Sequence, residues 1–184
     1  MNANMNTFQH AVDADVAERF ITATALYEET IRREGTPLDA YINLAVLYWQ
    51  CTEYGFNAGH RLPLDFIRLA GNRYSAVLDA AEMKFGYSPE IGFWRLYFDY
   101  ITLGEPEFDE KCKALVAEPG CTLVPYFYLY AEWNEEGRIY RKEAHQLLAE
   151  CKSCLTTKNR YIISVLESAA STLAVPGGGW QVRR

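Results

Sequence analysis

The chain has 184 residues, of which 49% are hydrophobic and 23% charged, a balance typical of a globular domain with a buried core. Its net charge of −6 argues against a nucleic-acid partner, which would need a clustered positive field. No apolar run approaches the roughly 18 residues of a membrane-spanning helix. The N-terminal segment is polar and then acidic, and the five cysteines form an odd set, so we expect a cytoplasmic protein without a membrane partner.

Helical spacing of apolar residues runs through most of the chain, whereas strict alternation is rare, so the sequence predicts an all-α fold. We expect about eight helices, near residues 13–34, 38–51, 64–85, 88–104, 107–117, 124–135, 140–154 and 160–173. The segment 52–63 contains Gly55, Gly59 and Pro63 and has the character of a turn. One domain is expected over residues 1–175, and the glycine-rich residues 176–184 are expected to form a flexible tail.

An internal repeat relates residues 92–105 to residues 125–138 at a shift of 33. Its identities pair Leu96 with Leu129, Tyr97 with Tyr130 and Gly104 with Gly137. A two-helix period of this length resembles the tetratricopeptide repeat (TPR), and Ala23–Tyr48 carries the best local match. The resemblance spans about residues 20–150 and implies antiparallel helical hairpins stacked as a short TPR-like α-solenoid. Pro37 is displaced and tyrosines replace small residues in the later units, so the alternative is an ordinary helical bundle.

The resemblance implies that the first helix of each pair lines a concave groove. The groove positions, and thus the expected partner-binding residues, are Ile42, Val46, Trp49, Trp94, Phe98, Phe127, Ala131 and Asn134. Most of them are apolar, so the groove is expected to grip an apolar or aromatic segment of another protein. The alternative is that these side chains only fill the core.

Motifs that carry chemistry are weak in this sequence. His60 and Arg61, in the turn-like segment, form a secondary candidate that suits an anion or a carboxylate, although a solvated loop pair is the plainer interpretation. Cys151 and Cys154 lie near a helix C-terminus, where the helix dipole does not favour a thiolate. The acidic pair Glu28–Glu29 is expected at a helix end or on a solvent face. We therefore expect neither metal nor cofactor.

These observations favour a non-enzymatic module for protein–protein interaction, which binds through the aromatic concave face or through an acidic outer face. By analogy at the level of the fold, the candidates are a bacterial immunity protein that neutralises a toxin, a chaperone for a secreted effector, and an adaptor. One alternative is a small helical enzyme or metal-binding protein that uses His60, His145, Cys151 and Cys154. Another is a homodimer whose aromatic surface is its own subunit interface.

Overall fold

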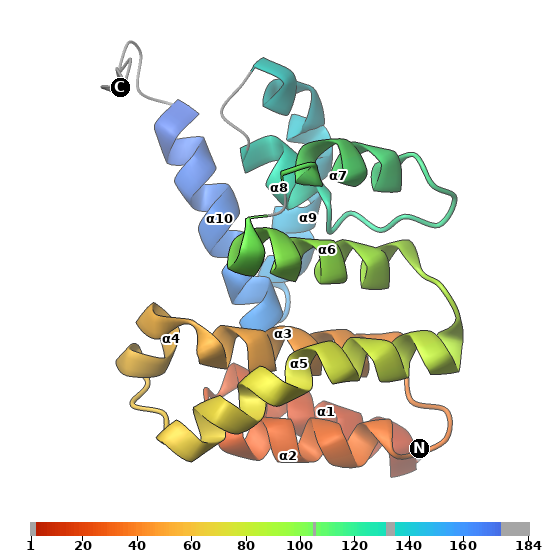
Figure 1. The fold of residues 1–184 in the computed structure, drawn as a ribbon, viewed down its shortest axis with the longest axis vertical. Helices are drawn as coiled ribbons and strands as arrows, with labels where there is room; N and C mark the ends of the chain where they lie inside the picture. Colours follow the sequence, from red (N-terminus) through yellow and green to blue (C-terminus); the bar gives the residue numbers. More distant parts are fainter. Residues whose placement is uncertain (1–2, 105, 132–134, 174–184) are drawn as a thin grey trace.

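A computed structural model describes residues 3–104, 106–131 and 135–173, and the regular elements in these ranges are all helical (Figure 1). The all-α class expected from the sequence is confirmed. In chain order the elements are α1 (Ala3–Val16), α2 (Phe20–Ile31), α3 (Leu38–Thr52), α4 (Tyr54–Gly59), α5 (Leu64–Phe85), α6 (Pro89–Leu103), α7 (Phe108–Val116), α8 (Tyr126–Ala131), the 3-10 helix η1 (Glu135–Tyr140), α9 (Arg141–Lys152) and α10 (Thr157–Leu173). The expected tail, 176–184, lies outside the described residues.

The expected bounds of α5 and α6 agree with the structure, because proline and glycine mark these helices. Pro63 precedes α5, which ends at Gly86, and Pro89 opens α6, which ends at Gly104. Gly86 and Gly104 have φ of 77° and 74°, values that glycine adopts without a steric penalty.

The structure differs from expectation in two regions of the N-terminal half. The single helix expected over residues 13–34 is two helices, α1 and α2, and the turn-like segment 52–63 contains the short helix α4. Both α1 and α4 end in a Schellman motif, the helix stop in which the chain turns through one left-handed residue. After α1 the amide of Arg19 donates to the carbonyl of Ala14 at 2.9 Å, and after α4 the amide of Leu62 donates to that of Asn57 at 3.0 Å.

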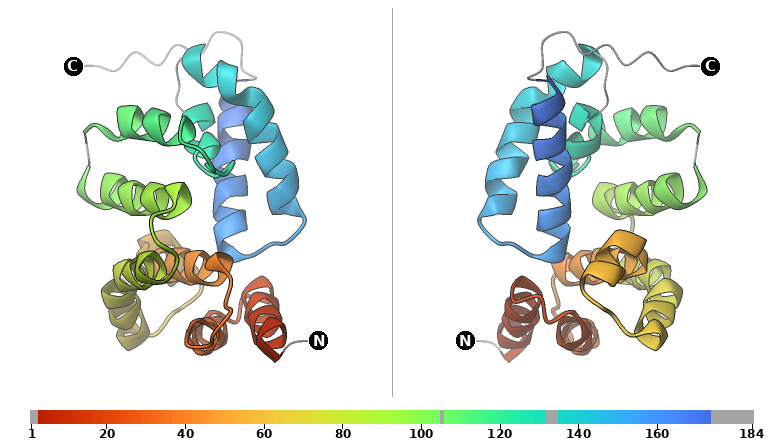
Figure 2. Two further views of the ribbon diagram at one scale, coloured as in Figure 1. Left: turned by 90° about the vertical axis from the view of Figure 1, so that its right-hand side faces the viewer. Right: turned by 90° about the vertical axis from the view of Figure 1, so that its left-hand side faces the viewer.

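Consecutive helices pack against one another from α1 to α10, with α4 serving as a short cap beside α3. The C-terminal helix α10 then returns to pack on α3 and α8, so the end of the chain lies against helices from its first half (Figure 2). One hydrophobic cluster runs through the whole stack. The TPR-like register stays a prediction. Within the described residues, no helix is long and apolar enough to cross a membrane.

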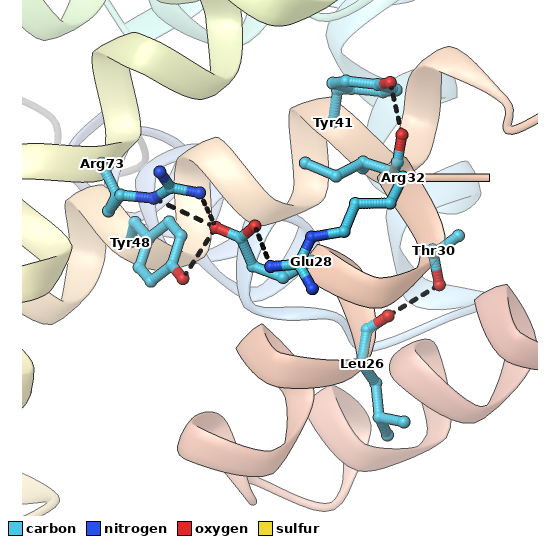
Figure 3. A network of polar contacts seen from close by, with 8 residues as sticks. Leu26, Glu28, Thr30, Arg32, Tyr41, Tyr48 and Arg73 are labelled. Atoms are coloured by element: carbon cyan, nitrogen blue, oxygen red, sulfur yellow. Dashed lines mark hydrogen bonds and ion pairs between the residues drawn. The ribbon is translucent and has the colours of Figure 1, made fainter.

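A buried carboxylate joins α2, α3 and α5 (Figure 3). Glu28 accepts hydrogen bonds from the Tyr48 hydroxyl at 3.2 Å and from Arg73 Nε at 3.1 Å, and Arg32 Nη2 lies 3.5 Å away. Of the two placements expected for Glu28, the residue lies near the end of α2 and not on a solvent face, because it is only 9% exposed. A carboxylate at this depth is tolerated because it is paired. Burial, together with the neighbouring charge of Glu28, raises the pKa of Tyr48 to about 12.

Candidate functional site

The residues expected to line an open groove lie mostly in the core. Six of the eight are at most 2% exposed: Ile42, Val46, Trp49, Trp94, Phe98 and Phe127. Ala131 is half-buried, and Asn134 lies outside the described residues. The prediction of an accessible aromatic groove is therefore wrong for these six side chains, and the alternative that they fill the core is confirmed.

The inner side of the stack is filled by α10, which the sequence did not indicate. The Tyr161 ring of α10 lies edge-on to Trp49 at 5.2 Å and to Phe127 at 6.1 Å between ring centroids. Its hydroxyl lies 2.6 Å from that of Tyr97, so the polar tip of each tyrosine has a partner. The protein thus places one of its own aromatic side chains where the TPR resemblance expected a partner's.

Asp15, at the end of α1, fastens the beginning of α10. Its carboxylate accepts hydrogen bonds from the backbone amide of Thr157 at 2.9 Å and from the Thr157 hydroxyl at 2.6 Å. The Tyr27 hydroxyl donates to the same carboxylate at 3.3 Å. Burial raises the pKa of Asp15 above its usual value, and these hydrogen bonds oppose that rise. A carboxylate from a distant helix therefore satisfies a free N–H group at the N-terminus of α10.

A cavity of about 250 Å³ opens beside this junction, between α2, α4 and α10. We call it the His60 cavity. The rings of Phe20 and Phe56 form its apolar part, and their centroids lie 4.8 and 4.6 Å from that of His60. Arg160 brings a guanidinium group from α10, which donates to the carbonyl of Val16 at 2.6 Å. The cavity lining therefore combines aromatic rings with hydrogen-bonding groups.

The two helix stops beside this cavity have charged residues at the left-handed position that glycine usually occupies. Glu18 and Arg61 are the residues at the left-handed positions of the two Schellman motifs, with φ of 57° and 52°. They are the only non-glycine residues with positive φ among those that the structure describes. A side chain in this conformation costs roughly 1–2 kcal/mol. Strain of this kind concentrates at functional sites, where side-chain identity matters more than stability.

Arginine outnumbers glutamate among the charged residues that line the His60 cavity and its neighbour. A second cavity of about 280 Å³ shares Glu18, Phe20 and His60 with the first and adds Arg19. Arg19 and Arg160 line these two cavities together with Glu18, so two positive charges face one negative charge among the lining residues. The buried Asp15 carboxylate is taken up by its hydrogen bonds to Thr157. Arg160 Nη2 lies 3.6 Å from Glu18. The corner is therefore suited to a negatively charged group.

Of the two residues in the secondary candidate, His60 lines the cavity and Arg61 is not among the lining residues. Their role in binding stays a prediction, and the other lining residues were not indicated by the sequence. Arg160 follows His60 by 100 positions, and no local pattern indicates that α10 returns to this corner. The left-handed conformation of Glu18 and Arg61 was likewise not indicated, because charged residues also occur inside helices.

The residues of the enzyme or metal-binding alternative are distributed over two parts of the fold. His60 lies at the end of α4, whereas His145, Cys151 and Cys154 belong to α9 and the turn after it. The His145 ring packs 6.2 Å from that of Tyr130, and burial raises the pKa of the Cys151 thiol to about 11. Across the ranges that the structure describes, no three His, Cys, Asp or Glu side chains form a group that could hold a metal ion.

Searches of protein-family models, of curated proteins and of solved structures found no match to this chain. The function has to follow from the residues of the site themselves.

Proposed function

We propose that the protein is a non-enzymatic interaction module that binds an acidic segment of another protein at the His60 cavity. The observation that supports this most is the pair of left-handed charged residues, Glu18 and Arg61, at two helix stops beside one cavity. Glycine at either position would make the fold more stable, so the side chains have another use.

The chemistry of the corner specifies the partner. Guanidinium groups recognise carboxylates by charge-assisted hydrogen bonds, and Arg19 and Arg160, which line the two adjoining cavities, supply two of them. The rings of Phe20 and Phe56 offer an apolar surface to a residue beside the carboxylate. The matching segment therefore carries Asp or Glu next to an apolar or aromatic residue.

This proposal keeps the expected class and changes the surface. A cytoplasmic immunity protein, secretion chaperone or adaptor works by binding another protein, and each is compatible with a recognition corner of this kind. The concave aromatic face no longer enters, because α10 covers it. The acidic outer face stays a prediction, and the excess of positive charge at the His60 cavity favours the corner instead.

Photo-crosslinking in the source cells tests the proposal. Ser164 of α10 is exposed and lines the His60 cavity, whereas Ser75 of α5 is exposed away from it. A photoreactive amino acid at Ser164 should give an adduct that is absent from the same replacement at Ser75. Mapping should place the crosslink in an acidic segment of the partner. Equal adducts from both positions, or a crosslink in a basic segment, would contradict the proposal.

A further inference from the structure

A separate pocket, of about 260 Å³, lies where the N-terminal ends of α3, α6 and α10 meet the end of α9. Its residues are different from those of the His60 cavity. We call it the Glu90 pocket, after the α6 carboxylate residue that lines it. An inference about this pocket therefore stands independently of the proposed function.

The Glu90 carboxylate is unusually placed for a charged group. The residue is 7% exposed, and its Oε1 has no hydrogen-bond partner among the residues that the structure describes. Lys158 Nζ lies 3.7 Å from Oε1, close enough for ion pairing but beyond hydrogen-bond distance. Buried polar atoms are almost always hydrogen-bonded, because an unsatisfied acceptor loses its hydration without compensation. Oε1 thus lacks a hydrogen bond, and Glu90 is one of the residues that line a pocket with room for a donor.

The charges around the pocket specify the kind of donor. Asp39 and Glu150 are exposed and line the same pocket, so with Glu90 three carboxylates face it, against the single ammonium group of Lys158. The balance of three negative charges and one positive is −2, which favours a cation over an anion. Leu147 and Ile162 are buried and supply an apolar wall beside the charged groups. Such a wall suits methylene groups better than a hydrated inorganic ion.

We propose that the Glu90 pocket binds a small organic cation, a primary ammonium or guanidinium group on an aliphatic stem. The head group donates to Glu90 Oε1, the stem lies on Leu147 and Ile162, and Asp39 and Glu150 offset the repulsion from Lys158. A free amine and the side chain of a lysine or arginine from another protein share this chemistry. The pocket is therefore assigned to the group, and the source is decided by experiment.

The test is a titration of the full chain with pentylamine and with butylguanidine, followed by NMR of the Leu, Ile and Val methyl groups. We expect saturable shifts at Leu147 and Ile162, and no such shifts with pentanol or pentanoate, which have similar stems without the positive charge. Glu90→Gln should weaken binding by at least about tenfold, because a hydrogen bond to a charged acceptor is lost. The matched control Glu110→Gln removes an exposed carboxylate of α7 and should leave the affinity unchanged.

Two further arms complete the design. If Glu90→Gln does not fold, as judged by circular dichroism, Asp39→Asn serves instead and should weaken binding by about two- to fivefold. A blocked Gly-Lys-Gly peptide that binds more tightly than pentylamine identifies a partner's side chain as the source, and the reverse order identifies a free amine. Absence of saturable binding by either cation, equal binding of pentanol, or an affinity unchanged in a folded Glu90→Gln variant would overturn the proposal.

Discussion

Replacing Arg61 by glycine is expected to stabilise the protein, although it removes a charged side chain. The residue has a φ of 52° in the stop that follows α4, and its side chain is exposed. Relieving the left-handed conformation contributes roughly 1–2 kcal/mol, and the greater freedom of glycine in the unfolded chain takes back about 0.5–1 kcal/mol. The net gain is about 0.5–1 kcal/mol, or a rise of roughly 1–4 °C in Tm for a chain of this size.

The assay is urea unfolding followed by circular dichroism, with the m-value checked for a change. The matched control is Gly104→Ala at the stop of α6, where φ is 74° and an added Cβ meets nothing within 4 Å. The Gly104→Ala variant should lose about 1 kcal/mol of unfolding free energy, because the substitution introduces the same backbone strain that Arg61→Gly removes. A loss of more than 1 kcal/mol in Arg61→Gly would refute the reasoning, since the Arg61 side chain would then stabilise the fold.

Three further predictions concern the core. Tyr161→Ala should cost about 3 kcal/mol and Tyr161→Phe about 1 kcal/mol in urea unfolding, and equal losses would contradict the ring packing against α3 and α8. Glu28→Gln should cost about 1.5–2 kcal/mol by weakening the hydrogen bonds from Tyr48 and Arg73 to a charged acceptor. The exposed neighbour Glu29, changed in the same way, should cost less than about 0.5 kcal/mol, and similar values for the two would argue against the buried network. The buried Cys151 thiol has a pKa of about 11 in the fold and 9.0 as its ordinary value. The folded state keeps this proton to a higher pH, so the stability that the protonated thiol contributes, on the order of 3 kcal/mol, is present below pH 9 and lost between about pH 9 and 11. The difference between the urea midpoints at pH 8 and 10.5 should therefore be smaller in Cys151→Ala than in wild type, and part of it remains because burial also raises the pKa of Cys51 and of Tyr48. An unchanged difference would contradict this assignment.

The sequence allowed the helical class and several helices to be predicted, because proline and glycine mark them. α5 and α6 are framed by Pro63, Gly86, Pro89 and Gly104, and their expected bounds agree with the structure. The stops after α1 and α4 were missed, since each turns on a charged residue that also occurs inside helices.

The sequence could not predict which helices pack against each other, for a different reason. Apolar spacing indicates that a helix buries a face, but it does not indicate which neighbour covers that face. Trp49 and Phe127 were expected to face a partner, and the covering side chain is Tyr161, more than 30 positions away from either. The burial of Glu28 near the end of α2 was likewise not indicated, because its partner Arg73 lies 45 positions away.

Charge reversal at the His60 cavity tests the central claim most directly. The source-cell proteins retained by the immobilised chain would be compared by quantitative mass spectrometry for wild type, Arg19→Glu and Arg68→Glu. Arg19 is exposed and lines the cavity adjoining the His60 cavity. Arg68 is an exposed arginine of α5, so the two variants change the net charge equally. The proposed function predicts a partner retained by wild type and Arg68→Glu but depleted at least about tenfold by Arg19→Glu, because attraction to a carboxylate becomes repulsion. Equal retention by both variants would contradict it.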